Sequence, residues 1–228
     1  MKERFDVADP MTHEFGKGYW ERHWAQSHDT ASVDLGGDVP NPYLVRETAG
    51  LVPGTALDAG CGTGGEAVWL AVNGWQVTAA DISATALARA SQRAAAASVS
   101  DRVTWVEADL TSWDPGRQFD LVVTSYAHPA MPQLAFFARI SEWVAPGGTL
   151  LIVGHLSDQT SKGSSQRTPT NAAVTLLGIT GLLDSTGWRI ETAEEETRAL
   201  AGPGSRALRL HDVVVRATRA RPREGRET

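Results

Sequence analysis

The sequence predicts one α/β domain built on a mostly parallel β-sheet. From Thr55 onward, short apolar runs alternate with longer alanine-rich runs, which is typical of strands alternating with helices. A glycine-rich segment stands where the first expected strand passes into the first helix. Near the end of the chain, two strand-like runs are separated by a short Gly/Pro turn, so the sheet is expected to end in an antiparallel hairpin.

Seven strands and four helices are expected from Thr55 to Thr218. The five strands that come first are Thr55–Ala59, Gln76–Ala80, Val103–Ala108, Asp120–Ser125 and Thr149–Gly154, and the helices between them are Gly65–Asn73, Ala84–Ala97 and Pro132–Val144. A polar segment, Ser157–Thr170, is expected to be a mobile lid, and a helix follows near Asn171–Thr186. The hairpin strands are Trp188–Thr197 and Ala207–Thr218. This order predicts βαβ units with right-handed crossovers.

The remaining segments complete the expected domain organisation. Residues 1–50 contain a helical pattern over Glu14–Ser27 and a Gly/Pro/Asn loop over Gly36–Pro42, and are expected to form a helical cap on the same domain. Residues 51–218 would form the ligand-binding domain. Residues 219–228 are rich in Arg and Glu and are expected to be a flexible, solvated tail.

The composition indicates a soluble protein without disulfides. The 228 residues carry a formal net charge of −6, which argues against a nucleic-acid partner because phosphate binding needs a basic face. The one cysteine, Cys61, excludes an intrachain disulfide and fits a reducing compartment. We find neither a signal-peptide core nor the roughly 18 apolar residues of a membrane span. We therefore expect a cytoplasmic monomer or homodimer that binds neither nucleic acid nor membranes.

The strongest motif is the glycine-rich loop LDAGCGTGG, residues 57–65. Glycines at a strand-to-helix junction let the backbone turn tightly and approach a ligand closely, and the helix that follows offers free N–H groups. Asp58, just before the glycines, is placed to fix the loop or to meet the ammonium group of a ligand. The loop also satisfies the dinucleotide pattern G-x-G-x-x-G, so NAD is an alternative ligand at this point.

Two further acids follow the next two strands. Asp81 ends the second strand, where an acid can hold a ribose diol in either kind of cofactor. Asp109 follows the third strand and suits the amino group of adenine. Asp58 favours a sulfonium cofactor over a dinucleotide, because its charge would repel a pyrophosphate at the same position. The loop and the acids together predict a site for S-adenosylmethionine (SAM).

From about Thr55 to Leu156, the sequence resembles the class I SAM-dependent methyltransferases. The matching segments are LDAGCGTG, AADIS, EADL, FDLVVTSY and APGGTLLIVGH. The resemblance implies a Rossmann-like three-layer sandwich with seven strands in the order 3-2-1-4-5-7-6. It also implies SAM as the cofactor and S-adenosylhomocysteine (SAH) as its product.

The resemblance further implies how the cofactor is held at its methionine end. Gly60, Gly62 and Gly64 would pack against the methionine part, with Cys61 as a small filler in the same loop. Ser125 would lie beside the methionine ammonium group.

At the nucleoside end, the resemblance implies four residues. Asp81 would take the ribose hydroxyls, and Ile82 would pack against the adenine. Asp109 and Leu110 would close the adenine pocket.

Candidate catalytic groups follow the fourth and fifth strands, because open α/β sheets bind ligands at the carboxyl ends of their strands. His128 follows the fourth strand together with Tyr126, and His155 follows the fifth. A histidine suits removal of a proton from the methyl acceptor near neutral pH. We expect His128 to act as this base or to orient the nucleophile, with His155 as the next candidate. Packing, or a hydrogen bond to backbone, is the alternative role of either ring.

The aromatic residues near the N-terminus allow two interpretations. Trp20 and Trp24 are spaced i, i+4 and share one helix face, which favours core packing of Trp24. Tyr19 and Trp20 could instead wall a substrate pocket, where aromatic rings attract a sulfonium. The segments YWERHW and DLGGDVPNPYL resemble the entry of small-molecule methyltransferases of the thiopurine, halide/thiol and tellurite-resistance groups. This resemblance implies a small molecule as methyl acceptor.

The sequence therefore predicts a SAM-dependent methyltransferase acting on a small nucleophile: a thiol, halide, hydroxyl or amine. A non-catalytic SAM-binding or SAH-binding protein is the alternative from a different class, and an NAD-binding oxidoreductase is a third. No metal is expected, because His, Cys and Asp residues do not cluster with metal-ligand spacing.

Overall fold

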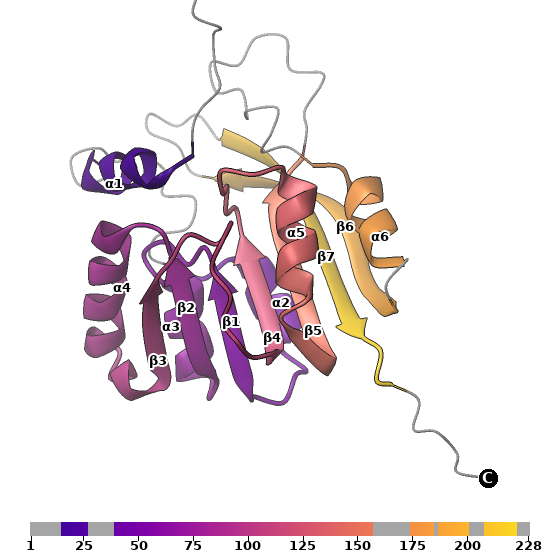
Figure 1. The fold of residues 1–228 in the computed structure, drawn as a ribbon, viewed down its shortest axis with the longest axis horizontal. Coiled ribbons are helices and arrows are strands. Elements are labelled where there is room, and N and C mark those ends of the chain that lie inside the picture. Colours follow the sequence, from indigo (N-terminus) through magenta and orange to yellow (C-terminus); the bar gives the residue numbers. More distant parts are fainter. Residues whose placement is uncertain (1–14, 27–38, 157–173, 185–186, 201–207, 223–228) are drawn as a thin grey trace, which may run out of the picture.

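The computed structural model describes residues 15–26, 39–156, 174–184, 187–200 and 208–222. Within these ranges the chain forms one seven-stranded sheet with helices packed on both faces (Figure 1). The strand order is β3-β2-β1-β4-β5-β7-β6. The expected α/β class, the three-layer Rossmann-like arrangement and the strand order are confirmed.

The parallel part of the sheet agrees closely with the expected elements. Its strands are β1 (Thr55–Ala59), β2 (Gln76–Asp81), β3 (Val103–Glu107), β4 (Phe119–Ser125) and β5 (Val144–His155), and the helices between them are α3 (Gly65–Val72), α4 (Ala84–Ala96) and α5 (Gln133–Ser141). A short 3₁₀ turn, Ser100–Arg102, precedes β3. The largest difference is β5, which begins at Val144 rather than Thr149. Its first residue pairs with Phe119, and the register then shifts before the regular pairing with β4 begins.

The expected antiparallel hairpin ends the sheet. β6 (Trp188–Leu200) pairs with β7 (Leu208–Arg219), and β7 also pairs antiparallel with β5. β7 thus lies between two strands, and its apolar run, Val213 to Val215, is fully buried. α6 (Leu176–Asp184) precedes the hairpin.

Helix α2 (Pro42–Thr48) is an element that the sequence analysis missed. The side-chain oxygen of Asn41 accepts a hydrogen bond from the Tyr43 N–H at 3.0 Å, and Pro42 takes the first helical turn. An Asn cap followed by Pro is a helix-start signal. The helix has only 7 residues, which is too short to give a clear periodic pattern.

The helices form two layers and leave one helix outside them. α2, α3 and α4 pack on one face of the sheet, and α5 and α6 pack on the other. α1 (Lys17–Gln26) belongs to neither layer; it lies above the carboxyl ends of β2 and β3, next to the start of α4 (Figure 1). The carboxyl ends of the strands are therefore covered by an element from the N-terminal region.

Several expectations fall partly or wholly outside the described residues. The proposed lid at Ser157–Thr170 lies there, as do the start of the helix expected from Asn171 and residues 223–228 of the tail. The division into cap, domain and tail stays a prediction. In the described part of the tail, Arg219 belongs to β7, and its guanidinium donates to the Val144 carbonyl at 2.6 Å.

Candidate active site

The glycine loop joins β1 to α3 through three residues with left-handed backbone conformation. Gly60, Gly62 and Gly64 have φ angles of +83°, +49° and +81°, a region that side chains other than glycine rarely adopt. A Cβ atom on Gly60 would lie 2.4 Å from the Cβ of Ala127, and one on Gly64 would lie 2.7 Å from the Cβ of Ala90. Both steric room and backbone conformation therefore demand glycine at these two positions.

Asp81 holds the glycine loop against the end of β2. Its Oδ2 accepts a hydrogen bond from the Gly62 N–H at 2.8 Å, and its Oδ1 accepts one from the Ser83 N–H at 2.9 Å. Burial raises the pKa of the Asp81 carboxyl above its ordinary value. A carboxylate can accept about four hydrogen bonds, so Asp81 can brace the loop and still accept hydroxyl groups from a ligand.

Two buried oxygen atoms below the loop lack partners. Asp58 is 1% exposed, and its Oδ2 accepts no hydrogen bond from any described residue. Burial, followed by the neighbouring charges of Glu66 and Asp81, raises the pKa of Asp58. The Oγ of Ser125, at the end of β4, is likewise buried and unpaired within the described ranges. Buried polar groups without partners are costly, and a cationic ammonium group would satisfy both.

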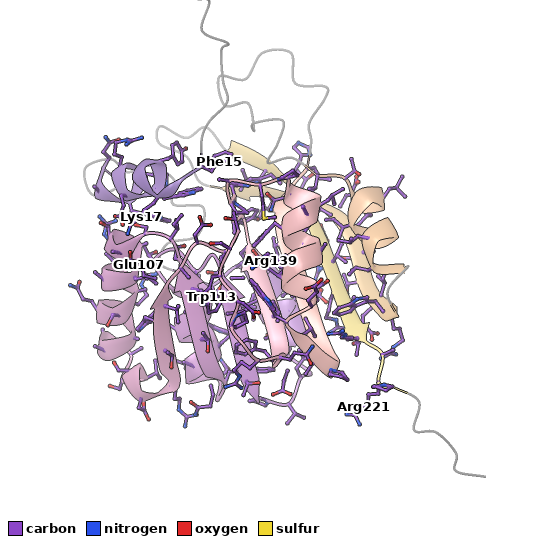
Figure 2. The ribbon with its side chains drawn as sticks, in the orientation of Figure 1. Phe15, Lys17, Glu107, Trp113, Arg139 and Arg221 are labelled. Atoms are coloured by element: carbon purple, nitrogen blue, oxygen red, sulfur yellow. The ribbon has the colours of Figure 1, made fainter. Side chains whose placement is uncertain are left out.

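A hollow of about 260 Å³ opens beside the ends of β2 and β3. Its lining residues are Lys17, Ile82, Glu107, Ala108 and Asp109. Lys17 of α1 forms an ion pair with Glu107, so that α1 closes one side of the hollow (Figure 2). The Oδ1 of Asp109 accepts hydrogen bonds from the Thr111 N–H at 2.9 Å and the Thr111 hydroxyl at 2.7 Å. The structure thus brings Ile82 and Asp109 together, as the sequence predicts for an adenine pocket.

Leu110, the other residue expected there, points elsewhere. Its side chain is buried in the apolar core on the α5 side of the sheet and is absent from the lining of the hollow. Arg139 of α5 donates to the Leu110 carbonyl at 2.9 Å and to the Trp113 carbonyl at 2.6 Å (Figure 2). These contacts anchor the segment that carries Asp109, so Leu110 supports the hollow from below.

Helix α1 is held over the site by Glu21. The Glu21 carboxylate accepts hydrogen bonds from the Ala84 N–H at 2.7 Å, the Thr85 N–H at 3.3 Å and the Ser83 hydroxyl at 3.2 Å. The first N–H groups of a helix have no partner within the helix, and its N-terminus favours negative charge. Glu21 therefore caps α4 from another helix.

The aromatic residues of α1 face the site rather than the core. No residue of α1 is buried, so the core packing expected for Trp24 is wrong. The Trp24 ring instead lies over the glycine loop, 3.1 Å from where a Cβ of Gly62 would be. Tyr19 and Trp20 make an edge contact with ring centroids 5.1 Å apart, and Phe15, just before the helix, stacks on Trp20 at 5.9 Å.

His128 and His155 lie together at the carboxyl ends of β4 and β5. Their rings are 6.1 Å apart, and the ring of Tyr126 stacks on His155 at 4.4 Å. Burial lowers the pKa of His128 to about 4, and its Nδ1 has no hydrogen-bond partner among the described residues. His128 is therefore uncharged at pH 7 and a weak proton acceptor, which favours the orienting role expected for it over the role of base.

The hairpin contributes two charged residues to the same region. Arg198 of β6 donates through Nε to the Oδ2 of Asp212 at 2.8 Å and through its terminal nitrogen to the Tyr126 hydroxyl at 2.7 Å. Asp212 of β7 is 0% exposed. Its other oxygen, Oδ1, lies 3.6 Å from the Nδ1 of His155.

The described part of the chain contains no group of three or more His, Cys, Asp or Glu residues placed to hold a metal ion. None of its helices is long and apolar enough to cross a membrane.

Comparisons with known proteins bear on this arrangement. Residues 56–148 match a family of methyltransferase domains. The chain is 29% identical over 162 residues to "probable thiol methyltransferase 2" of Arabidopsis thaliana, an alignment that covers 69% of this chain and 70% of that protein. It is 31% identical over 149 residues to thiocyanate methyltransferase 1 of the same plant, with 64% and 65% covered. Among solved structures, the DhpI–SAH complex matches 91% of this chain and 96% of its own, with a TM-score of 0.59 and 23% identity.

The similarity to these proteins covers both the glycine loop and the fold of the sheet. These matches support a class I SAM-dependent methyltransferase. SAM is therefore the cofactor of this methyltransferase, in place of the NAD left open by the loop pattern alone. The unpaired oxygens of Asp58 and Ser125 fit its ammonium group, and the hollow beside Ile82 and Asp109 fits its adenine.

Four residues of the methyltransferase site escaped the sequence analysis. Phe15 precedes α1 and Glu21 belongs to it, while Arg198 and Asp212 belong to the hairpin. The signal for Asp212 was an acid directly before a run of valines in a central strand, because a charge in such a place needs a partner. Which residue provides that partner depends on strand register, which the sequence does not specify.

Proposed function

We propose that this enzyme transfers the methyl group of SAM to a small thiol or a comparable sulfur anion. The two relatives described above carry names that specify a thiol and thiocyanate as acceptors. In both acceptors sulfur is the natural nucleophile, and sulfur anions react well without strong electrostatic help. Methyl transfer from an activated sulfonium mainly needs alignment of the nucleophile and exclusion of water.

The observation that carries the proposal is the closed aromatic end of the site. Phe15 is 5% exposed and lies 5.7 Å from His128, beside the segment that follows β4 (Figure 2). Phe15 also stacks on Trp20, and beyond His128 the rings of His155 and Tyr126 stack in turn, so ring contacts run from α1 to the end of β5. A small, weakly hydrated sulfur nucleophile suits such aromatic surroundings better than an ammonium-bearing amine or a macromolecule.

We also propose roles for individual residues. The glycine loop (Gly60, Cys61, Gly62 and Gly64) and the oxygens of Asp58 and Ser125 hold the methionine part, while Asp81 accepts the ribose hydroxyls. Ile82 and Asp109 enclose the adenine, with Leu110 supporting them from the core. On the acceptor side, Tyr19, Trp20 and Phe15 shape the pocket, and His128 orients the sulfur by donating its ring N–H.

The test is a panel of nucleophiles offered one at a time with SAM, with SAH release as the readout. We expect turnover of an aliphatic thiol and of thiocyanate to exceed that of a phenol, a primary amine and iodide by at least tenfold. A phenol or amine methylated faster than every sulfur compound would contradict the sulfur assignment. SAH binding without release above background for any acceptor would favour the non-catalytic alternative.

Phe15→Ala makes the acceptor panel a stricter test of the pocket, because the substitution opens the aromatic end of the site without changing the glycine loop. It should widen the acceptor range toward bulkier thiols and raise KM for small ones. Val52→Ala, at a residue that is 87% exposed, is the matched control and should leave both unchanged.

We propose further that the enzyme acts in the cytoplasm as a monomer or homodimer and without nucleic acid. The single cysteine and the net charge of −6 support this. Cell fractionation, light scattering of the purified protein and a nucleic-acid gel-shift assay test the three statements separately.

A further inference from the structure

His155 and Asp212 are held together by the register of the sheet. In the antiparallel pairing of β5 with β7, His155 and Asp212 are directly opposite each other. The Nδ1 of His155 and the Oδ1 of Asp212 are 3.6 Å apart, and catalytic hydrogen bonds are often long until substrate is bound. The Oδ1 atom is buried and accepts no hydrogen bond from another described residue.

Asp212 is itself fixed by Arg198. The Nε of Arg198 donates to Oδ2 at 2.8 Å, which leaves Oδ1 for the histidine. Burial opposes the charge of Asp212, but the nearby His155 ring and the hydrogen bond and positive charge of Arg198 outweigh it, so the pKa of Asp212 falls below its ordinary value. An ionised carboxylate beside Nδ1 keeps the proton on that nitrogen and leaves the Nε2 lone pair free.

His155 is further held by a stacked tyrosine. Tyr126 lies against its ring at 4.4 Å, and the Tyr126 hydroxyl accepts a hydrogen bond from Arg198 at 2.7 Å. Tyr126 has a φ of +55°, a strained conformation for a bulky residue that surrounding contacts must maintain. Arg198 thus fixes both neighbours of His155.

The two histidines differ in their surroundings. His128 is half-buried and forms no ion pair with a carboxylate among the described residues, and burial lowers its pKa to about 4. Among the described residues, the titratable groups beside the His155 ring are Asp212 from β7 and Tyr126 and His128 from the segment after β4. Arg198 from β6 and Tyr43 from α2 lie beside Asp212.

We propose that His155 is the proton acceptor for a neutral thiol and that Asp212, anchored by Arg198, positions it. This rests on the proposed sulfur specificity. The Nε2 lone pair of His155 takes the S–H proton, and the S–H bonding electrons stay on sulfur as a thiolate. The thiolate forms the new S–C bond while the bond from the methyl carbon to the SAM sulfur breaks, leaving its electrons on that sulfur in SAH. His155 then returns the proton to solvent.

The positioning claim is tested by the tautomer of His155, read from the ¹⁵N shifts of its ring in the protein without substrate. The wild-type ring should carry its proton on Nδ1. In Asp212→Asn, Arg198 still needs an oxygen acceptor, so the amide NH₂ must face His155 and the ring proton should move to Nε2. An unchanged tautomer in the variant, or a proton on Nε2 in the wild type, would overturn the claim.

A matched control separates this effect from a general loss of stability. Glu47 is also a buried carboxylate beside an arginine of β7, with Arg216 Nε 3.4 Å from it, but it contacts neither histidine. Glu47→Gln should therefore leave the His155 tautomer unchanged. If Asp212→Asn does not fold, the wild-type tautomer and the kinetics of His155→Gln still decide the matter.

The base role is tested by two thiols of different acidity. With an aliphatic thiol, which is mostly protonated at neutral pH, Asp212→Asn and His155→Gln should lower kcat by about 10²–10⁴. With an aryl thiol that is already ionised, the loss should be less than about tenfold, since no proton needs removal. Equal losses with both thiols would refute the base role. If no thiol is methylated at all, the proposed function fails, whereas the tautomer measurement still decides the arrangement of His155 and Asp212.

Discussion

His128 should make the protein less stable in mild acid, and replacing it should remove this sensitivity. Burial lowers its pKa from 6.5 to about 4 in the folded protein. Between these values the unfolded chain binds a proton that the folded chain does not, so unfolding is favoured as the pH falls. At pH 5, 1.5 units below the ordinary value, the loss is about 2 kcal/mol, at 1.36 kcal/mol per unit.

The assay is urea unfolding of wild type and His128→Gln at pH 7.5 and pH 5. Between pH 7.5 and pH 5, the free energy of unfolding of the wild type should fall by about 2 kcal/mol more than that of His128→Gln. This difference does not depend on how much the substitution itself changes stability at pH 7.5. His211→Gln is the matched control, because His211 is exposed on β7. Equal losses in wild type and His128→Gln would show that the ring is charged or solvated, and would contradict the conclusion that His128 is too weak a base to accept the proton.

The other predictions concern the cofactor site and its covering helix. Gly60→Ala should abolish SAH binding in calorimetry and cost about 1–3 kcal/mol of stability, because its Cβ would lie 2.4 Å from another Cβ, whereas Gly116→Ala, at a φ of +65° with open space around it, should leave binding intact. Asp81→Ala should weaken SAH binding by about 1–3 kcal/mol, and unchanged calorimetry would exclude Asp81 from the site. Glu21→Gln should speed hydrogen exchange of α1 amides, because α1 loses the charged acceptor that holds it to α4; equal exchange rates would show that α1 is held by its aromatic contacts instead.

The parallel core and the cofactor loop could be predicted from sequence because their signals are local. The buried residues of β1 and β4 form short apolar runs, and the glycine loop follows β1 within a few residues. Asp81 ends β2 and Asp109 follows β3 by two residues, so their meeting at one edge is a consequence of parallel strand order. Those signals sufficed for the fold, the cofactor and the positions of the acids.

What the sequence analysis missed depends on contacts between distant segments. Asp212 meets His155 only through the β5–β7 register, and Arg198 joins them across the hairpin. Glu21 caps a helix more than sixty residues away. Trp24 has the spacing of a core residue but covers the glycine loop, because α1 docks on the strand ends and not on a sheet face. Helix periodicity indicates which residues share a face, and tertiary docking decides what that face meets.

Transfer of a labelled methyl group tests the central claim most directly. SAM labelled in its methyl group is incubated with the enzyme and an aliphatic thiol, and the label is followed into the thioether while SAH is counted. The arrangement described here predicts equal amounts of labelled thioether and SAH with the wild type, and neither with Gly60→Ala. SAH that accumulates without labelled thioether, or wild-type protein that binds SAH yet methylates no sulfur compound, would contradict it.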